Sequence, residues 1–160
     1  MCSADLDRCA SWDLSVPQVF AELQSLIEDG LVDIWIGGPP CSTWSRARWS
    51  STPGPRPLRM RGDFCWGLPG LYKWEKLRVA EANVLLLHSL AMAEAVSLRG
   101  GGHLLEHPED PGGPPYPSIW DTEEMTSMEE RTGAVRQHID QCMSGCPSKK
   151  ATCLSGTLVG

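Results

Sequence analysis

The segment of residues 31–36 constrains the fold more than any other part of the chain, because it is apolar apart from Asp33 and ends abruptly. A short apolar run without strict alternation is typical of a strand that is covered on both faces, as in parallel sheets. The run stops at residues 37–40, Gly-Gly-Pro-Pro, where glycines allow unusual dihedral angles and prolines cannot extend a ladder. The pattern predicts a buried parallel strand that leads directly into a tight turn.

A helix is predicted immediately before this strand. Ser15 and Gln18 form an S-x-x-Q capping box, and Pro17 fits the first helical turn, where its missing N–H costs nothing. Apolar residues then follow at three- and four-residue spacing, and Gly30 can adopt the left-handed conformation that ends a helix.

Helix and strand signals alternate along the rest of the chain. They predict a helix over 73–98, a strand over 103–106, a helix over 121–131 capped by Asp121 and Glu124, and strands over 135–141 and 152–159. This order predicts an α/β fold with a mainly parallel sheet and a C-terminal antiparallel hairpin. We expect a single domain over residues 1–160, with residues 1–14 poorly defined.

Residues 42–71 have no sustained period and predict a long functional loop. The net charge of the chain is −6, yet no acidic residue occurs between Asp33 and Asp63. That window holds five arginines: Arg46, Arg48, Arg56, Arg59 and Arg61. The loop is therefore either a basic binding surface or a solvated segment with excess arginine. Four nearby tryptophans could stack on bases or anchor the loop onto the core: Trp44, Trp49, Trp66 and Trp74.

The composition indicates a protein that is not secreted. The first residues are polar and mildly acidic, unlike a secretory signal, and the seven cysteines form no regular framework. No apolar run approaches the roughly 18 residues that a membrane span needs. We therefore expect reduced thiols, no membrane association, and a location in the nucleus or cytoplasm.

Two predicted strands end in residues that suit catalysis, the first in Cys41 and the second in Glu106. Ligands gather at the carboxyl ends of strands in open α/β sheets. A cysteine held on a short glycine/proline turn suits a nucleophile if nearby cations such as Arg46 and Arg48 favour its thiolate. A carboxylic acid on the facing strand would donate or accept a proton. The other interpretation of Cys41 is a buried structural thiol.

At these residues the chain resembles the C5-cytosine DNA methyltransferases. Residues 32–41, Val-Asp-Ile-Trp-Ile-Gly-Gly-Pro-Pro-Cys, are similar to the catalytic strand and loop of that family, with Ser45 four residues on. The resemblance implies that Cys41 attacks C6 of a flipped-out cytosine, so that C5 accepts a methyl group from S-adenosylmethionine. It also implies that Glu106 holds the base at N3, although His107-Pro108 stands where the family usually has Asn-Val. The implied fold is a partial Rossmann-like methyltransferase sheet.

Other site residues follow from the same resemblance. The cofactor contacts that it implies are Asp13, Gly38 and Pro39. The nucleic-acid contacts that it implies are Ser45, Arg46, Arg48 and Lys150. Lys150 lies in a tail, residues 145–152, that matches the Gly-x-Pro-Gln-x-Arg-x-Arg segment of the family only at its glycine and proline.

The chain also lacks a counterpart to part of the family pattern. The two strands and the glycine-rich turn that bind the cofactor would precede Asp13, where only a dozen residues stand. We therefore expect a truncated domain, similar to methyltransferase-like segments of mobile elements, whose strand at 31–36 is an exposed edge that self-associates or pairs with a missing N-terminal half. The expected partner is DNA. The alternative function is a non-catalytic, methyltransferase-derived module that binds nucleic acid or protein.

Two metal-dependent interpretations are disfavoured. Zinc deaminases need P-C-x-x-C, but Trp44 stands where the second cysteine would be, and no H-x-E triplet occurs. Cys142 and Cys146 have a spacing within the range for zinc, but no second close pair accompanies them. We predict no metal site.

Overall fold

A computed structural model describes residues 12–50, 53–145 and 150–158. Four strands form one open sheet in the order β1-β2-β4-β3. Their bounds are β1 Ile34–Gly37, β2 Gly102–Pro108, β3 Val135–Asp140 and β4 Ala151–Gly156. The predicted α/β class and the C-terminal hairpin are confirmed.

The prediction of a mainly parallel sheet is wrong. β1 and β2 are the one parallel pair, whereas β4 pairs antiparallel with both β2 and β3. β4 lies between β2 and β3, so the hairpin turns its last strand back into the sheet instead of leaving it at the edge. A strand that returns through a hairpin must run opposite to its predecessor, and here it therefore separates strands that point the same way.

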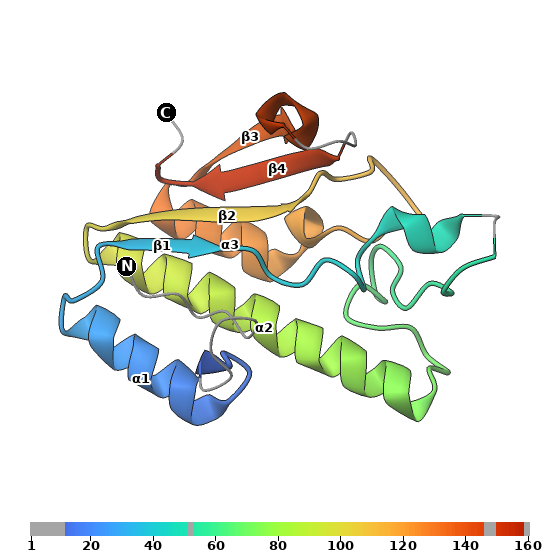
Figure 1. Ribbon diagram of the computed structural model, residues 1–160, viewed down its shortest axis with the longest axis horizontal. Coiled ribbons are helices and arrows are strands. Elements are labelled where there is room, and N and C mark those ends of the chain that lie inside the picture. The colour runs from blue at the N-terminus through green and yellow to red at the C-terminus, as the bar shows by residue number, and fades with distance from the viewer. Residues whose placement is uncertain (1–11, 51–52, 146–149, 159–160) are drawn as a thin grey trace.

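The three α-helices of the described residues cover one face of the sheet (Figure 1). They are α1 Pro17–Glu28, α2 Lys73–Leu98 and α3 Glu123–Thr132. Side chains of β2 and β4 that point to this face, Leu105 and Cys153, are buried with residues of α2 and α3 in the main core. A second core cluster joins α1 to α2. Short 3-10 helices occupy Arg46–Trp49, Ile119–Asp121 and Gln141–Ser144.

The helices lie where the periodicity places them, and Gly30 follows the first helix in the predicted left-handed conformation, with φ of 73°. The predicted N-terminal caps, however, are wrong. α1 begins after Val16 without a side-chain cap, because the Ser15 hydroxyl donates to the Asp13 carboxylate instead. α3 begins after Thr122, whose hydroxyl accepts from the Met125 N–H. Several residues in a row can satisfy a cap pattern, and the surrounding contacts decide which one does.

β1 is an edge strand, and one of its faces is exposed. Ile34 and Ile36 are 54% and 70% exposed, and Leu31 before them is 69% exposed. Trp35 points the other way and packs against the helices. The expectation that this segment is covered on both faces is therefore wrong for the described residues, while the exposed apolar edge that the sequence predicts is present.

α2 is the one helix of the described residues that is long and apolar enough to cross a membrane. Its apolar character has a simpler use here, because it packs against α1, α3, β1 and β2. Met92, Ala93 and Val96 are fully buried in these contacts. A central core helix needs the same composition as a membrane span.

Candidate functional site

The carboxyl ends of β1 and β2 lie side by side, as the sequence predicts. Gly37 pairs with Leu105, which places Gly38 level with Glu106. A Cβ atom added to Gly38 would lie 3.7 Å from Glu106 Oε2. The Gly-Gly-Pro-Pro-Cys turn therefore leaves β1 directly beside the Glu106 carboxylate. Cys41, at the end of this turn, is a free and half-buried thiol.

Glu106 lies on the sheet face that the described helices leave open, and its carboxylate has two partners. Oε1 accepts hydrogen bonds from Gln141 Nε2 and Lys150 Nζ, both at 3.2 Å. Lys150 was expected to bind nucleic acid, and the structure instead places its ammonium on the carboxylate of the candidate site. This ion pair is one-third exposed, so an incoming polar group can compete for Glu106.

His107 follows Glu106 in β2 but does not belong to the candidate site. Successive strand residues point to opposite faces, so His107 lies beneath the site while Glu106 lies above it. Its ring is 2% exposed and contacts the rings of Trp44 and Trp120 edge-on. Burial first, and then the positive charges of Lys150 and Arg59, lower the pKa of His107 to about 3. The period-two pattern alone would have separated His107 from Glu106.

Arg59 holds the loop after Cys41 in place, and the sequence did not predict this role. Its side chain is fully buried and donates to Thr43 Oγ1, Asn83 Oδ1, and the carbonyls of Cys65 and Val79. Burial lowers the pKa of Arg59 to about 10, so the guanidinium is still charged at neutral pH. One side chain thus links the turn that follows the candidate nucleophile to α2 and to the loop after residue 58.

Arg48 is also turned inward. Its Nε donates to the carbonyl of Ser42 at 2.6 Å, and its Nη1 donates to the carbonyl of Arg56 at 3.0 Å. The side chain is 9% exposed, so in this conformation it stabilises the loop and does not face a phosphate. Ser45 has a structural role as well, because its hydroxyl accepts from the Ala47 N–H and caps a 3-10 helix. Arg46 is exposed.

The remaining arginines of the loop are bound to acids elsewhere in the chain. Arg56 forms an ion pair with buried Glu75, and this contact lowers the pKa of Glu75 to about 2. Arg61 binds Asp110 and Asp121. Neither alternative for the loop therefore describes it, because most of its arginines are internal cross-links and only Arg46 is left as an exposed cation without a described ion pair.

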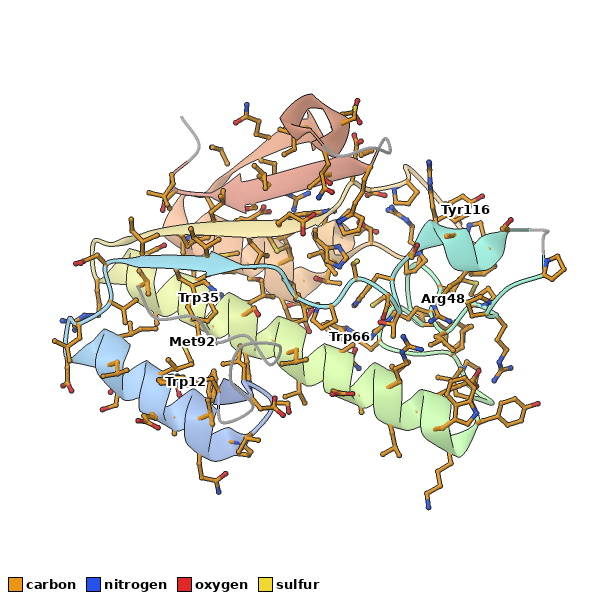
Figure 2. All side chains as sticks on the ribbon, in the orientation of Figure 1. Trp12, Trp35, Arg48, Trp66, Met92 and Tyr116 are labelled. Atoms are coloured by element: carbon orange, nitrogen blue, oxygen red, sulfur yellow. The ribbon has the colours of Figure 1, made fainter. Side chains whose placement is uncertain are left out.

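The four tryptophans near the loop differ in burial. Trp44 is buried in the main core, and Trp66 packs against it edge-on. Figure 2 shows Trp66 beside α2. Trp49 is half-buried beside Tyr116. Trp74, in the first turn of α2, is 59% exposed.

The residues assigned to S-adenosylmethionine, Asp13, Gly38 and Pro39, do not line the open hollow at the other end of the strands. The Asp13 carboxylate already accepts two hydrogen bonds, both from Ser15. An open hollow of about 420 Å³ lies near Gly30 and Gly101, before the strands begin and away from Gly38 and Pro39. The backbone N–H groups around Gly101 already bond to carbonyls of Val96 and neighbouring residues, so they do not form an anion site.

No described set of three or more His, Cys, Asp or Glu side chains is arranged to hold a metal ion. Cys142 is an exposed free thiol, and the predicted partner Cys146 lies outside the described residues. The chemistry available at the carboxyl ends of β1 and β2 is therefore that of a thiol, a carboxylate and an ammonium group.

Comparisons of this chain with protein-family models, with curated proteins and with solved structures found no match.

Proposed function

We propose that this chain carries the base-attacking site of a methyltransferase-type, Rossmann-like α/β domain. One observation supports this proposal above all: the Gly-Gly-Pro-Pro-Cys turn leaves β1 beside Glu106 at the carboxyl ends of two parallel strands. Binding sites of open α/β sheets form at such ends. The strand directions also agree with it, because β1, β2 and β3 point the same way and only the final strand is reversed.

More particularly, we propose chemistry of the C5-cytosine DNA methyltransferase type. The Cys41 thiolate forms a bond to C6 of a flipped-out cytosine, the C5–C6 double bond opens, and the electron pair moves toward C5. Glu106 binds the base at N3 and carries the accompanying proton. The base displaces Lys150 or Gln141 from Glu106, which is possible because the ion pair is partly exposed.

Methyl transfer to C5 requires S-adenosylmethionine, for which the described residues form no cradle. The proposed activity of these residues is therefore the covalent step on the base, with the methyl donor held by residues outside the described part or by another chain. The alternative, a non-catalytic nucleic-acid-binding module, is favoured by this same missing cradle.

A test of the covalent step needs no methyl donor. 5-Azacytosine has a nitrogen at position 5, so addition of a thiolate at C6 breaks the N5–C6 double bond and N5 takes up a proton. Incubation of the purified chain with an oligonucleotide that contains 5-azacytosine should give a protein–DNA adduct, visible by denaturing electrophoresis and by intact mass. Cys41→Ser should abolish it.

The matched control is Cys142→Ser, which removes an exposed free thiol from a different element, the 3-10 helix Gln141–Ser144. It should leave the adduct unchanged. Circular dichroism would confirm that both variants are folded. An adduct that persists in Cys41→Ser, or that disappears in Cys142→Ser, would remove Cys41 from the mechanism. Binding without any adduct would favour the non-catalytic module.

A further inference from the structure

The first two turns of α2 run out toward the loop beyond the strands (Figure 1). They present most of their side chains to solvent. In residues 72–78 only Glu75 is buried. Tyr72, Trp74 and Leu77 are between 59% and 64% exposed. Large apolar side chains that cluster at this exposure mark an interaction surface more often than a bare helix end.

The same segment is locally cationic in a chain whose net charge is −6. Its exposed charged residues are Lys73, Lys76 and Arg78. The one acidic residue of residues 72–78, Glu75, is buried, where its carboxylate binds Arg56 and accepts a hydrogen bond from the Tyr72 backbone N–H. The first exposed acid along the helix is Glu81, one turn further on. We refer to the exposed set as the α2 patch: Tyr72, Lys73, Trp74, Lys76, Leu77 and Arg78.

The α2 patch is continuous with the candidate site. Arg78 Nη2 donates to the hydroxyl of Ser42 at 3.4 Å, and Ser42 directly follows Cys41. A chain that runs across the patch therefore reaches the turn that carries the nucleophile. A ligand that matches the lysines is negatively charged, and one that matches the exposed Trp74 ring offers flat apolar faces.

We propose that the α2 patch binds single-stranded nucleic acid and guides it to Cys41. Phosphates lie against Lys73 and Lys76, and an unpaired base stacks on Trp74, the combination by which single-strand binders hold their ligands. A duplex offers its charges but keeps its bases stacked on one another. This inference rests on the proposed function for the choice of nucleic acid, because an anionic membrane would also attract lysines and an exposed tryptophan.

The test is fluorescence anisotropy of a labelled single-stranded oligodeoxynucleotide, titrated with the full chain at several salt concentrations. Lys73→Gln combined with Lys76→Gln should reduce the slope of log K against log salt by about 1.4, since each phosphate contact on a single strand contributes about 0.7. Trp74→Ala should weaken binding about 5- to 150-fold, and Trp74→Phe should recover most of the loss.

The matched controls lie at the other end of the same helix. Leu98→Ala and Arg99→Gln replace an exposed apolar residue and an exposed cation there, and both should bind like the unmodified chain. Equal affinities for the patch variants and the unmodified chain, or no binding by the folded chain, would overturn the proposal. So would binding to vesicles of anionic phospholipid without binding to the oligonucleotide.

The two proposals fail separately. If the unmodified chain forms no adduct with 5-azacytosine but binds the oligonucleotide through the α2 patch, the covalent chemistry is rejected and the binding surface is kept. An adduct that forms equally well in the patch variants would reject the guiding role of the patch and keep the chemistry.

Discussion

The guanidinium carbon of Arg59 lies 4.0 Å from the centroid of the Trp44 ring, and both side chains are buried. A guanidinium is more weakly hydrated than an ammonium group, so its burial costs less free energy, and stacking on an indole offsets part of that cost. Trp44 follows Cys41 by three residues, and the backbone N–H of Trp44 donates to the Cys41 carbonyl at 2.9 Å. The geometry of the candidate nucleophile therefore depends on an arginine whose position in the sequence suggested a surface charge.

Replacement of Arg59 by methionine should destabilise the fold. The change leaves the hydroxyl of Thr43, the amide of Asn83 and two backbone carbonyls without their donor, and buried unpaired polar groups cost about 1–3 kcal/mol each. Two of these bonds, to Thr43 Oγ1 and to the Val79 carbonyl, are buried. We therefore expect a total loss of about 2–6 kcal/mol in the free energy of unfolding, measured with urea. Arg46→Met, in an exposed position, should stay within about 0.5 kcal/mol. A similar small effect for both variants would contradict the structural role of Arg59.

Stability should fall as the pH drops from 7 toward 5. The pKa of His107 is lowered to about 3, and that of His103 is also lowered, in both cases first by burial. Below about pH 6.5 these two histidines are protonated in the unfolded chain but stay neutral in the folded chain, so acid favours unfolding. Each such proton contributes about 1.4 kcal/mol per pH unit. The contribution of these neutral histidines to the free energy of unfolding is fully present above their pKa in the unfolded chain. It is lost as the pH falls from that value toward their pKa in the folded protein.

Urea unfolding at pH 7, 6 and 5 measures this slope. His107→Gln should reduce the slope of the free energy of unfolding against pH by up to the contribution of one proton, about 1.4 kcal/mol per pH unit, even if the variant is less stable overall. The carboxylate of Glu75 does not interfere, because its contribution is lost only between its ordinary pKa of 4.5 and its lowered value of about 2. An unchanged slope in His107→Gln would show that His107 titrates normally in the folded protein.

The exposed face of β1 should cause self-association. Ile34 and Ile36 lie on an edge strand, where unpaired backbone groups and apolar side chains favour pairing with a second chain. We expect a sedimentation coefficient that rises with protein concentration. Ile36→Lys should reduce this dependence, whereas Leu77→Lys, an exposed position in the part of α2 that runs out beyond the strands, should not. A monodisperse monomer at all concentrations would contradict this prediction.

Glu106 should control the rate of the covalent step without supporting the fold. Glu106→Gln keeps the shape of the side chain and its contacts with Gln141, but it removes the negative charge that binds Lys150 and carries the proton at N3. Loss of a positioned acid–base group slows a reaction about 10²- to 10⁴-fold. The rate of adduct formation with 5-azacytosine should fall accordingly, while the midpoint of thermal unfolding changes by a few degrees at most. An unchanged rate would exclude Glu106 from the step.

The arrangement of the candidate site was largely predictable from the sequence. Two apolar segments that end in Gly-Gly-Pro-Pro-Cys and in Glu106 are joined through a helix, a connection that favours parallel neighbours in one sheet, and β1 and β2 do pair in this way. The long periodic run of α2 determined that crossover. By contrast, the fate of each loop arginine was not predictable, because residues 42–71 have no period and the partners of Arg59 and Arg61 lie far along the chain.

The sequence by itself thus determined the helices, the strands and the turn at Cys41, since these depend on side chains within a few residues of one another. Only the tertiary structure decided that β4 enters the sheet between β2 and β3, that Arg48 and Arg59 are buried, and that Trp74 is exposed while Trp44 is not. The physical reason is range. Periodicity and turn chemistry are local, whereas burial and strand pairing depend on contacts between segments that the sequence leaves far apart.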